Sequence, residues 1–183
     1  MKKFELTSEF NLNFFGRKFF RIKALVNIER YGVKAGDLGG WVEKEDNLSQ
    51  SGNAWVSGDA VVSGNAKVYG NAVVSGDAVV SGNAKVSGDA VVSGDAVVSG
   101  DAKVSGDADY AVIKGFGTVY RPTTFFRCHD GEARVTCGCF YGTIDEFREQ
   151  VKRTRKGKVA DEYLKIADLM EYHFKEEDSG ENV

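Results

Sequence analysis

The sequence is poor in the residues on which many catalytic and export-related assignments depend. It has one proline, two histidines and three cysteines in 183 residues. The start MKKFELTSEF has no apolar run behind its lysines, so we expect neither a signal peptide nor a transmembrane span. An odd number of cysteines without an export signal favours reduced thiols in a cytoplasm. The net charge of −3 gives no general attraction to nucleic acid or to membranes, and neither is an expected partner.

Glycine, in contrast, is abundant, with 22 residues, and most of it lies in a six-residue repeat. The unit V-S-G-(D/N)-A-x runs through residues 56–104, and x is Val or Lys. A period of six predicts a left-handed parallel β-helix, in which three such sides close one triangular coil of about 18 residues. Strand residues alternate, so Ala and Val should point inward while x and Ser point outward. Glycine at each corner supplies backbone angles that other residues avoid.

The outward x residues group in threes, which a triangular coil requires and a simple six-residue period does not. Lys67, Lys85 and Lys103 recur once every three repeats and should stack on one face, about 4.8 Å apart. The other two faces should carry apolar columns, namely Val61, Val79 and Val97 on one and Trp55, Val73 and Val91 on the other.

The regular repeat separates two dissimilar ends. We predict an N-terminal β cap at 1–32 with a hairpin around Gly16, and a β-helix at 33–109. Its first coil, 33–53, is irregular, and Val42 and Leu48 fall in the inward Ala register. Residues 110–183 should form an α+β module: a hairpin at Asp130-Gly131, a helix opened by a Thr143–Glu146 capping box, a second helix at about 161–174, and a frayed acidic tail at 176–183.

The outward columns are the candidate binding surfaces. Lys67, Lys85 and Lys103, with Tyr69 beside them, suit a phosphate-bearing small molecule or an acidic protein, although exposed lysines also serve solubility alone. Apolar columns are rarely left bare. We therefore expect the C-terminal helices to cover one Val face and a second copy, in a dimer or trimer, to cover the other. The stacked corner residues Asp59, Asp77 and Asp95 either tolerate their repulsion or attract a cation or basic partner.

Two catalytic or metal-binding interpretations are weaker. Six-residue-repeat β-helices are best known as acyltransferases with a histidine base, yet the only histidines here are His129 and His173, outside the repeat. Cys128, His129, Cys137 and Cys139 lie within twelve residues, but their spacing lacks the C-x2-C pairs of structural zinc sites. We expect ordinary thiols, no metal, no cofactor and no catalytic residue; the acyltransferase stays open as an alternative.

The chain resembles β-helix proteins encoded by phages and prophages, which often carry the label of transferase. The likeness is carried by RIKALVNIERYGVKAGDLGGWVEKEDNLSQSGNAWV at 21–56, the V-S-G-D-A array, and TFFRCHDGEARVTCGCFYGTIDEFREQV at 124–151. Small phage proteins of this kind often act on a host component. The resemblance therefore implies a non-enzymatic binding protein in the bacterial cytoplasm that inhibits or sequesters an antiviral defence protein or nucleotide signal. A virion accessory protein with the solenoid as a spacer is a further alternative.

Overall fold

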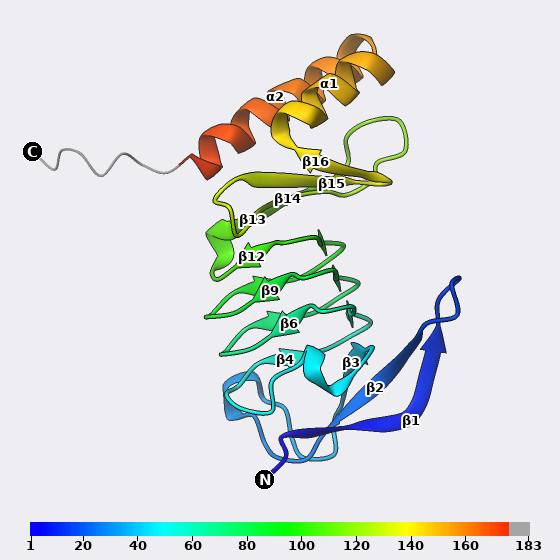
Figure 1. Cartoon of the computed structure of the whole chain (residues 1–183), viewed down its shortest axis with the longest axis vertical. Helices are drawn as coiled ribbons and strands as arrows, with labels where there is room; N and C mark the ends of the chain where they lie inside the picture. Colours follow the sequence, from blue (N-terminus) through cyan, green and yellow to red (C-terminus); the bar gives the residue numbers. More distant parts are fainter. Residues whose placement is uncertain (176–183) are drawn as a thin grey trace, which may run out of the picture.

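A computed structural model describes residues 1–175, so the predicted frayed tail at 176–183 lies outside the described residues. The molecule is elongated (Figure 1): an N-terminal hairpin at one end, a stack of coils in the middle, and a sheet with two helices at the other end. Within residues 1–175, no helix has both the length and the apolar character needed to cross a bilayer.

The middle of the chain is the predicted parallel β-solenoid, built from two-residue strands. Its strands are β4 (Trp55–Val56), β5 (Val61–Val62), β6 (Lys67–Val68), β7 (Val73–Val74), β8 (Val79–Val80), β9 (Lys85–Val86), β10 (Val91–Val92), β11 (Val97–Val98) and β12 (Lys103–Val104). They form three parallel columns, β4-β7-β10, β5-β8-β11 and β6-β9-β12. Lys67 pairs with Lys85, and Lys85 with Lys103, which confirms that three repeats make one coil.

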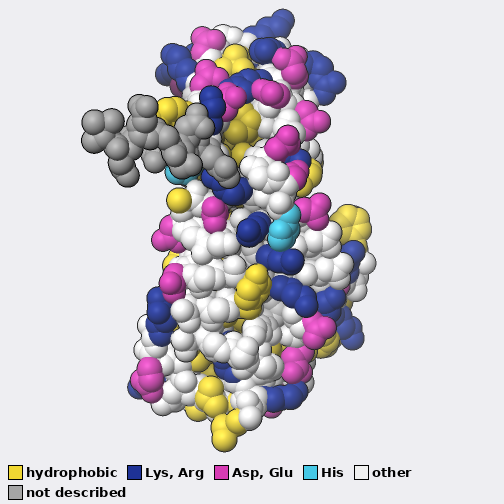
Figure 2. All heavy atoms as spheres, turned by 60° about the vertical axis from the view of Figure 1, so that its left-hand side comes forward, with side chains coloured by type: hydrophobic (Ala, Val, Ile, Leu, Met, Phe, Trp, Pro, Cys, Tyr) yellow, Lys and Arg dark blue, Asp and Glu magenta, His cyan; other side chains and the backbone are white. Residues whose placement is uncertain are grey.

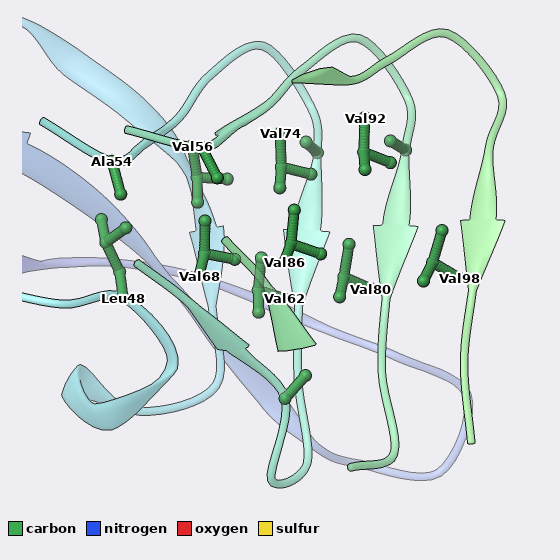
Figure 3. Packing of buried hydrophobic residues seen from close by; sticks show 14 of the residues in the cluster. Leu48, Ala54, Val56, Val62, Val68, Val74, Val80, Val86, Val92 and Val98 are labelled. Carbon is green, nitrogen blue, oxygen red and sulfur yellow. The ribbon is translucent and has the colours of Figure 1, made fainter. Parts of the chain in front are cut away.

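The inward residues of the repeat form the core, as predicted. Every alanine and every inward valine of the repeat between Ala54 and Val104 has no exposed surface. Figure 3 shows the inward valines in rows, with Val56, Val74 and Val92 side by side in one row. Each buried valine stabilises the fold by about 1.5–3 kcal/mol relative to an exposed one. The small alanines allow the three sides to approach each other closely.

The corners depend on glycine for two separate reasons. Gly82 has a φ of +69°, in the left-handed region that side chains with a Cβ rarely adopt. It also lies directly under Gly100, and a Cβ on Gly82 would stand 2.8 Å from the Gly100 nitrogen. Gly94 has a similar φ of +66°, but a Cβ there would meet no atom within 4 Å. The close stacking of coils is therefore an additional constraint on Gly82.

The N-terminal end contains the predicted hairpin around Gly16, formed by β1 (Phe4–Leu12) and β2 (Lys18–Ala24). β2 pairs antiparallel with β3 (Leu38–Val42), and β3 pairs parallel with β5, so the hairpin extends one column into a six-stranded sheet. Two short 3-10 helices, η1 (Glu29–Tyr31) and η2 (Glu45–Asn47), lie before and after β3.

The predicted register of the first coil is wrong by two residues. Val42 pairs with Val62, and Leu48 with Val68, so both occupy the inward Val position and not the Ala position. Two extra residues between Leu48 and Val56 cause the shift. This segment carries Gln50, whose Oε1 accepts from the backbone nitrogens of Lys3 and Phe4 at 2.7 and 3.2 Å, and whose Nε2 donates to the Phe4 carbonyl at 3.1 Å. The longer coil thus holds the N-terminal strand.

The C-terminal module has four antiparallel strands, where the sequence predicted two. After the 3-10 helix η3 (Asp107–Asp109) come β13 (Tyr110–Ile113), β14 (Thr123–Arg127), β15 (Ala133–Cys137) and β16 (Phe140–Thr143). Helix α1 (Ile144–Thr154) begins with the predicted capping box, in which the Glu146 nitrogen donates to Thr143 Oγ1 at 3.1 Å. Helix α2 (Gly157–Phe174) begins about four residues earlier than predicted.

This module closes the end of the solenoid through threonine side chains. The Val97 nitrogen donates to Thr124 Oγ1 at 3.0 Å, and Thr136 Oγ1 donates to the Val97 carbonyl at 2.8 Å. The His129 nitrogen donates to the Asp101 carbonyl at 3.1 Å. These contacts satisfy backbone groups of the last coil that would otherwise lack partners.

Candidate functional site

The lysine column lies on the solenoid face formed by β6, β9 and β12. Lys67, Lys85 and Lys103 are adjacent in register, and all three side chains are exposed. Within residues 1–175, no ion pair involves any of them. Three like charges at strand spacing repel each other by roughly 1 kcal/mol per neighbouring pair in water, and an anion would relieve that repulsion.

Hydrogen-bonded amide ladders border the lysine column at both corners. On one side Asn65 donates to Asn83 at 3.2 Å, and Asn83 donates to Asp101 at 3.0 Å. On the other side, the ladder from Asn53 through Asn71 ends at Asp89, whose carboxylate pairs with Arg30 at 2.9 Å. An amide both donates and accepts, so it continues a ladder, whereas aspartate only accepts and ends it. Lys85 therefore has a neutral amide, Asn83, at the corner before it, and at the corner after it the carboxylate of Asp89, which is paired with Arg30.

Tyr69 lies beside Lys67, as predicted, at the start of this face. Tyr69 is 41% exposed. Lys67 and Tyr69 line a surface hollow together with Leu48, Gln50 and the acidic residues Glu45 and Asp46. Glu45 is paired with Lys2 at 3.0 Å, and Asp101 lies two residues before Lys103. Lys85 is the middle lysine of the column, paired in register with Lys67 on one side and Lys103 on the other. Over the side of the molecule drawn in Figure 2, basic and acidic side chains are present both over the middle of the molecule and over the C-terminal module.

The apolar columns differ from the prediction at one position. Val91 and Val97 are 39% and 36% exposed, and Val61, Val73 and Val79 are half-buried. Trp55, predicted to point into solvent, is only 3% exposed. It lies against β3: a Cβ on Gly39, in that strand, would stand 2.7 Å from its ring. Trp55 is thus part of the contact between the N-terminal end and the solenoid.

The prediction that the C-terminal helices cover a Val face is wrong. Their apolar stripes instead bury Phe125 and Val135 of the C-terminal sheet, and they contact β15, β16 and each other. The sequence identified the correct residues on α2, since Tyr163, Ile166, Ala167, Met170 and Phe174 are all buried. It assigned them the wrong partner, because the sheet that they cover has two strands that the sequence did not reveal.

The cysteines and histidines are dispersed. Cys128 is buried, and burial raises the pKa of its thiol to about 11. Cys137 accepts a hydrogen bond from Thr123 Oγ1 at 3.2 Å, while Cys139 and His129 are exposed. His173 is exposed, with Nε2 3.2 Å from the Ala108 carbonyl oxygen. In the described part of the chain, no three His, Cys, Asp or Glu side chains gather in a way that could hold a metal ion.

The comparison with protein families agrees with the geometry of the coils. Residues 66–82 and 84–100 match the YdcK beta solenoid repeat. The two stretches begin at Ala66 and Ala84, which are equivalent positions in successive coils because the lysines that follow them pair with each other. The match to the YdcK repeat covers only the middle of the chain, so it supports the solenoid and leaves both ends unmatched. Among curated proteins, no match to the chain was found.

One exposed region was not singled out by sequence reasoning. The tip of the hairpin carries Phe14 and Phe15, which are 98% and 83% exposed. The sequence did contain a signal, because two adjacent phenylalanines at a hairpin turn have no neighbouring strand to cover them.

Proposed function

We propose that this chain is a non-enzymatic binding protein of phage or prophage origin that inhibits or sequesters a bacterial host component. The solenoid serves as the rigid scaffold, and the lysine column is the surface that meets the partner. The observation that carries the proposal is the alignment of three exposed lysines without carboxylate partners in residues 1–175. The preferred ligand is a phosphate-bearing small molecule, namely a nucleotide signal. An acidic protein surface is the second choice.

The rigidity of the face supports this choice. Each lysine-bearing strand is bonded to the next coil, with the Lys67 nitrogen 2.9 Å from the Ala84 carbonyl and the Lys85 nitrogen 2.8 Å from the Ala102 carbonyl. The lysine stems therefore start from fixed positions about 4.8 Å apart. A phosphate offers several acceptor oxygens and can bridge two neighbouring ammonium groups at that spacing. Tyr69 adds an aromatic surface next to Lys67 for a nucleobase.

The test is binding to the purified protein, with a charge-reversal variant. Protein isolated from a bacterial lysate is denatured, and the released small molecules and captured proteins are identified by mass spectrometry. A panel of cyclic and linear nucleotides, with coenzyme A included, is then titrated by calorimetry. We expect Lys85→Glu combined with Lys103→Glu to weaken nucleotide binding at least about 20-fold. Lys156→Glu combined with Lys165→Glu changes the net charge equally, lies at helix α2 and should leave the affinity unchanged.

Each other outcome has a definite meaning. Nucleotide binding that survives the reversal in the lysine column, or that falls equally in both variants, contradicts the proposed surface. Retention of coenzyme A together with acyl transfer would refute the non-enzymatic proposal. If a host protein is captured and its binding depends on Lys85, the proposed surface is correct, but the partner is an acidic protein and not a nucleotide.

A further inference from the structure

The hairpin extends beyond the sheet that supports it. The last pairing of β2 with β3 joins Phe20 to Val42, so residues 10–19 form a two-stranded arm without a third strand. Figure 1 shows this arm projecting away from the solenoid. Its turn is well formed: Asn13 Oδ1 accepts from the nitrogens of Phe15 and Arg17 at 3.0 and 2.9 Å. A two-stranded ribbon alone is marginally stable in water, so an additional covering layer is expected.

The surface of the arm is apolar and basic. Phe10 and Leu12 are 44% and 60% exposed, and the nearly bare rings of Phe14 and Phe15 stack edge-to-face at 5.6 Å. Residues 10–20 contain no acidic side chain, but they include Lys18 and Arg17, of which Arg17 lies 3.9 Å from Glu43 outside the arm. The arm therefore suits a partner surface that is apolar and acidic.

The same chain carries such a surface on the column β5-β8-β11. Val79 and Val97 point outward there, and the corner residues Asp59, Asp77 and Asp95 border them. Arg21 lies 3.6 Å from Asp59, and Lys114 pairs with Asp95. Asp77, between them, has no ion pair within residues 1–175. Apolar and charge complementarity thus both match the arm.

We propose that the arm of one copy docks on the Val79–Asp77 surface of a second copy. Within its own chain the arm belongs to the same continuous sheet as the column, in the order β1-β2-β3-β5-β8-β11, and β3 and β5 stand between the hairpin and β8. Two copies that exchange arms form a closed two-fold dimer, and three copies joined head-to-tail form a closed ring. This inference is independent of the ligand proposed for the lysine column.

The experiment uses two variants that damage opposite halves of the contact. Phe14→Ser with Phe15→Ser alters the arm, and Val79→Glu alters the receiving surface. Multi-angle light scattering should show an oligomer for the wild type and a monomer for each variant, with self-association at least about 30-fold weaker. Mixing the two monomeric variants should restore association, since one supplies an intact arm and the other an intact surface. Circular dichroism verifies that each variant is folded.

A matched control and a charge exchange make the test specific. Leu169→Ser with Tyr172→Ser removes exposed apolar side chains from α2, and it should leave the assembly unchanged. Arg17→Glu with Lys18→Glu should dissociate the oligomer, and Asp77→Lys should restore it. A monomeric wild type at all concentrations, or an arm variant that assembles normally, overturns the proposal. So does a monomer that binds phosphatidylserine vesicles through Phe14 and Phe15, because a lipid surface would then be the partner.

Discussion

Replacing two corner glycines by alanine separates the backbone conformation from the stacking of coils. Gly94→Ala introduces a Cβ at a φ of +66° with no atom within 4 Å, so its cost is conformational alone, about 1–2 kcal/mol. Gly82→Ala has the same conformational cost at a φ of +69°. Its Cβ also stands 2.8 Å from the Gly100 nitrogen and 3.0 Å from the Gly100 oxygen, and backbone atoms there cannot rotate aside. That overpacking adds about 1–3 kcal/mol.

The assay is urea unfolding followed by circular dichroism, with thermal unfolding as a second measurement. Gly82→Ala should lower the free energy of unfolding by about 1–3 kcal/mol more than Gly94→Ala, a difference of roughly 2–12 °C in Tm for a chain of this length. The m-value should be unchanged in both variants, because the unfolded surface is the same. Equal losses in the two variants would refute the conclusion that coil stacking, and not φ alone, requires glycine at Gly82.

Two further results are expected from the ends of the solenoid. Lys3 is buried, its Nζ donates to the Ala54 carbonyl at 2.7 Å, and burial lowers its pKa to about 8 from 10.5. The unfolded chain therefore binds more protons between pH 8 and 10.5. As the pH rises across this window, the free energy of unfolding of the wild type should increase by about 1–3 kcal/mol relative to that of Lys3→Met. Urea titrations of both proteins at about pH 7.5 and 10.5 measure this change. A difference between the two proteins that does not change with pH would contradict the prediction. The thiols should also react with N-ethylmaleimide in a fixed order near neutral pH. Exposed Cys139 should react first, and buried Cys128, with its pKa raised to about 11, should react last, as followed by mass spectrometry. A fast phase that persists in Cys139→Ser would count against this order.

The repeat was readable from sequence because each of its positions has one physical task. Glycine turns the corner, alanine and valine fill the core, and the recurrence of Lys67, Lys85 and Lys103 gives the coil length. The irregular parts were not readable in the same way. Leu48 was placed in the Ala register because nothing in the local sequence marks the two additional residues that follow it. Strands β13 and β16 are short and are defined by pairing with β14 and β15, not by a pattern of their own.

The candidate surfaces also divide into those that the repeat predicts and those that depend on contacts between distant segments. The lysine column followed from spacing alone, and the structure places its three members side by side. The burial of Trp55 depends on Gly39, in a different part of the chain, whose missing side chain leaves space for the indole ring. Contacts of this kind join segments with no shared periodicity, so a single sequence does not reveal them. The exposed tip at Phe14 and Phe15 has the same origin, because the absence of a covering strand is a property of the assembled sheet.

The recurrence of one lysine per coil means that the solenoid can change its length only in steps of one coil if the lysine column is to stay continuous. Insertion or removal of one whole coil changes the separation of the hairpin arm and the C-terminal helices by about 4.8 Å and preserves every column. A change of a single repeat instead turns everything beyond it by roughly one third of a revolution, so lysines would continue onto a valine face. Length and orientation are therefore separate variables in this molecule, and a partner that touches both ends would select for whole coils.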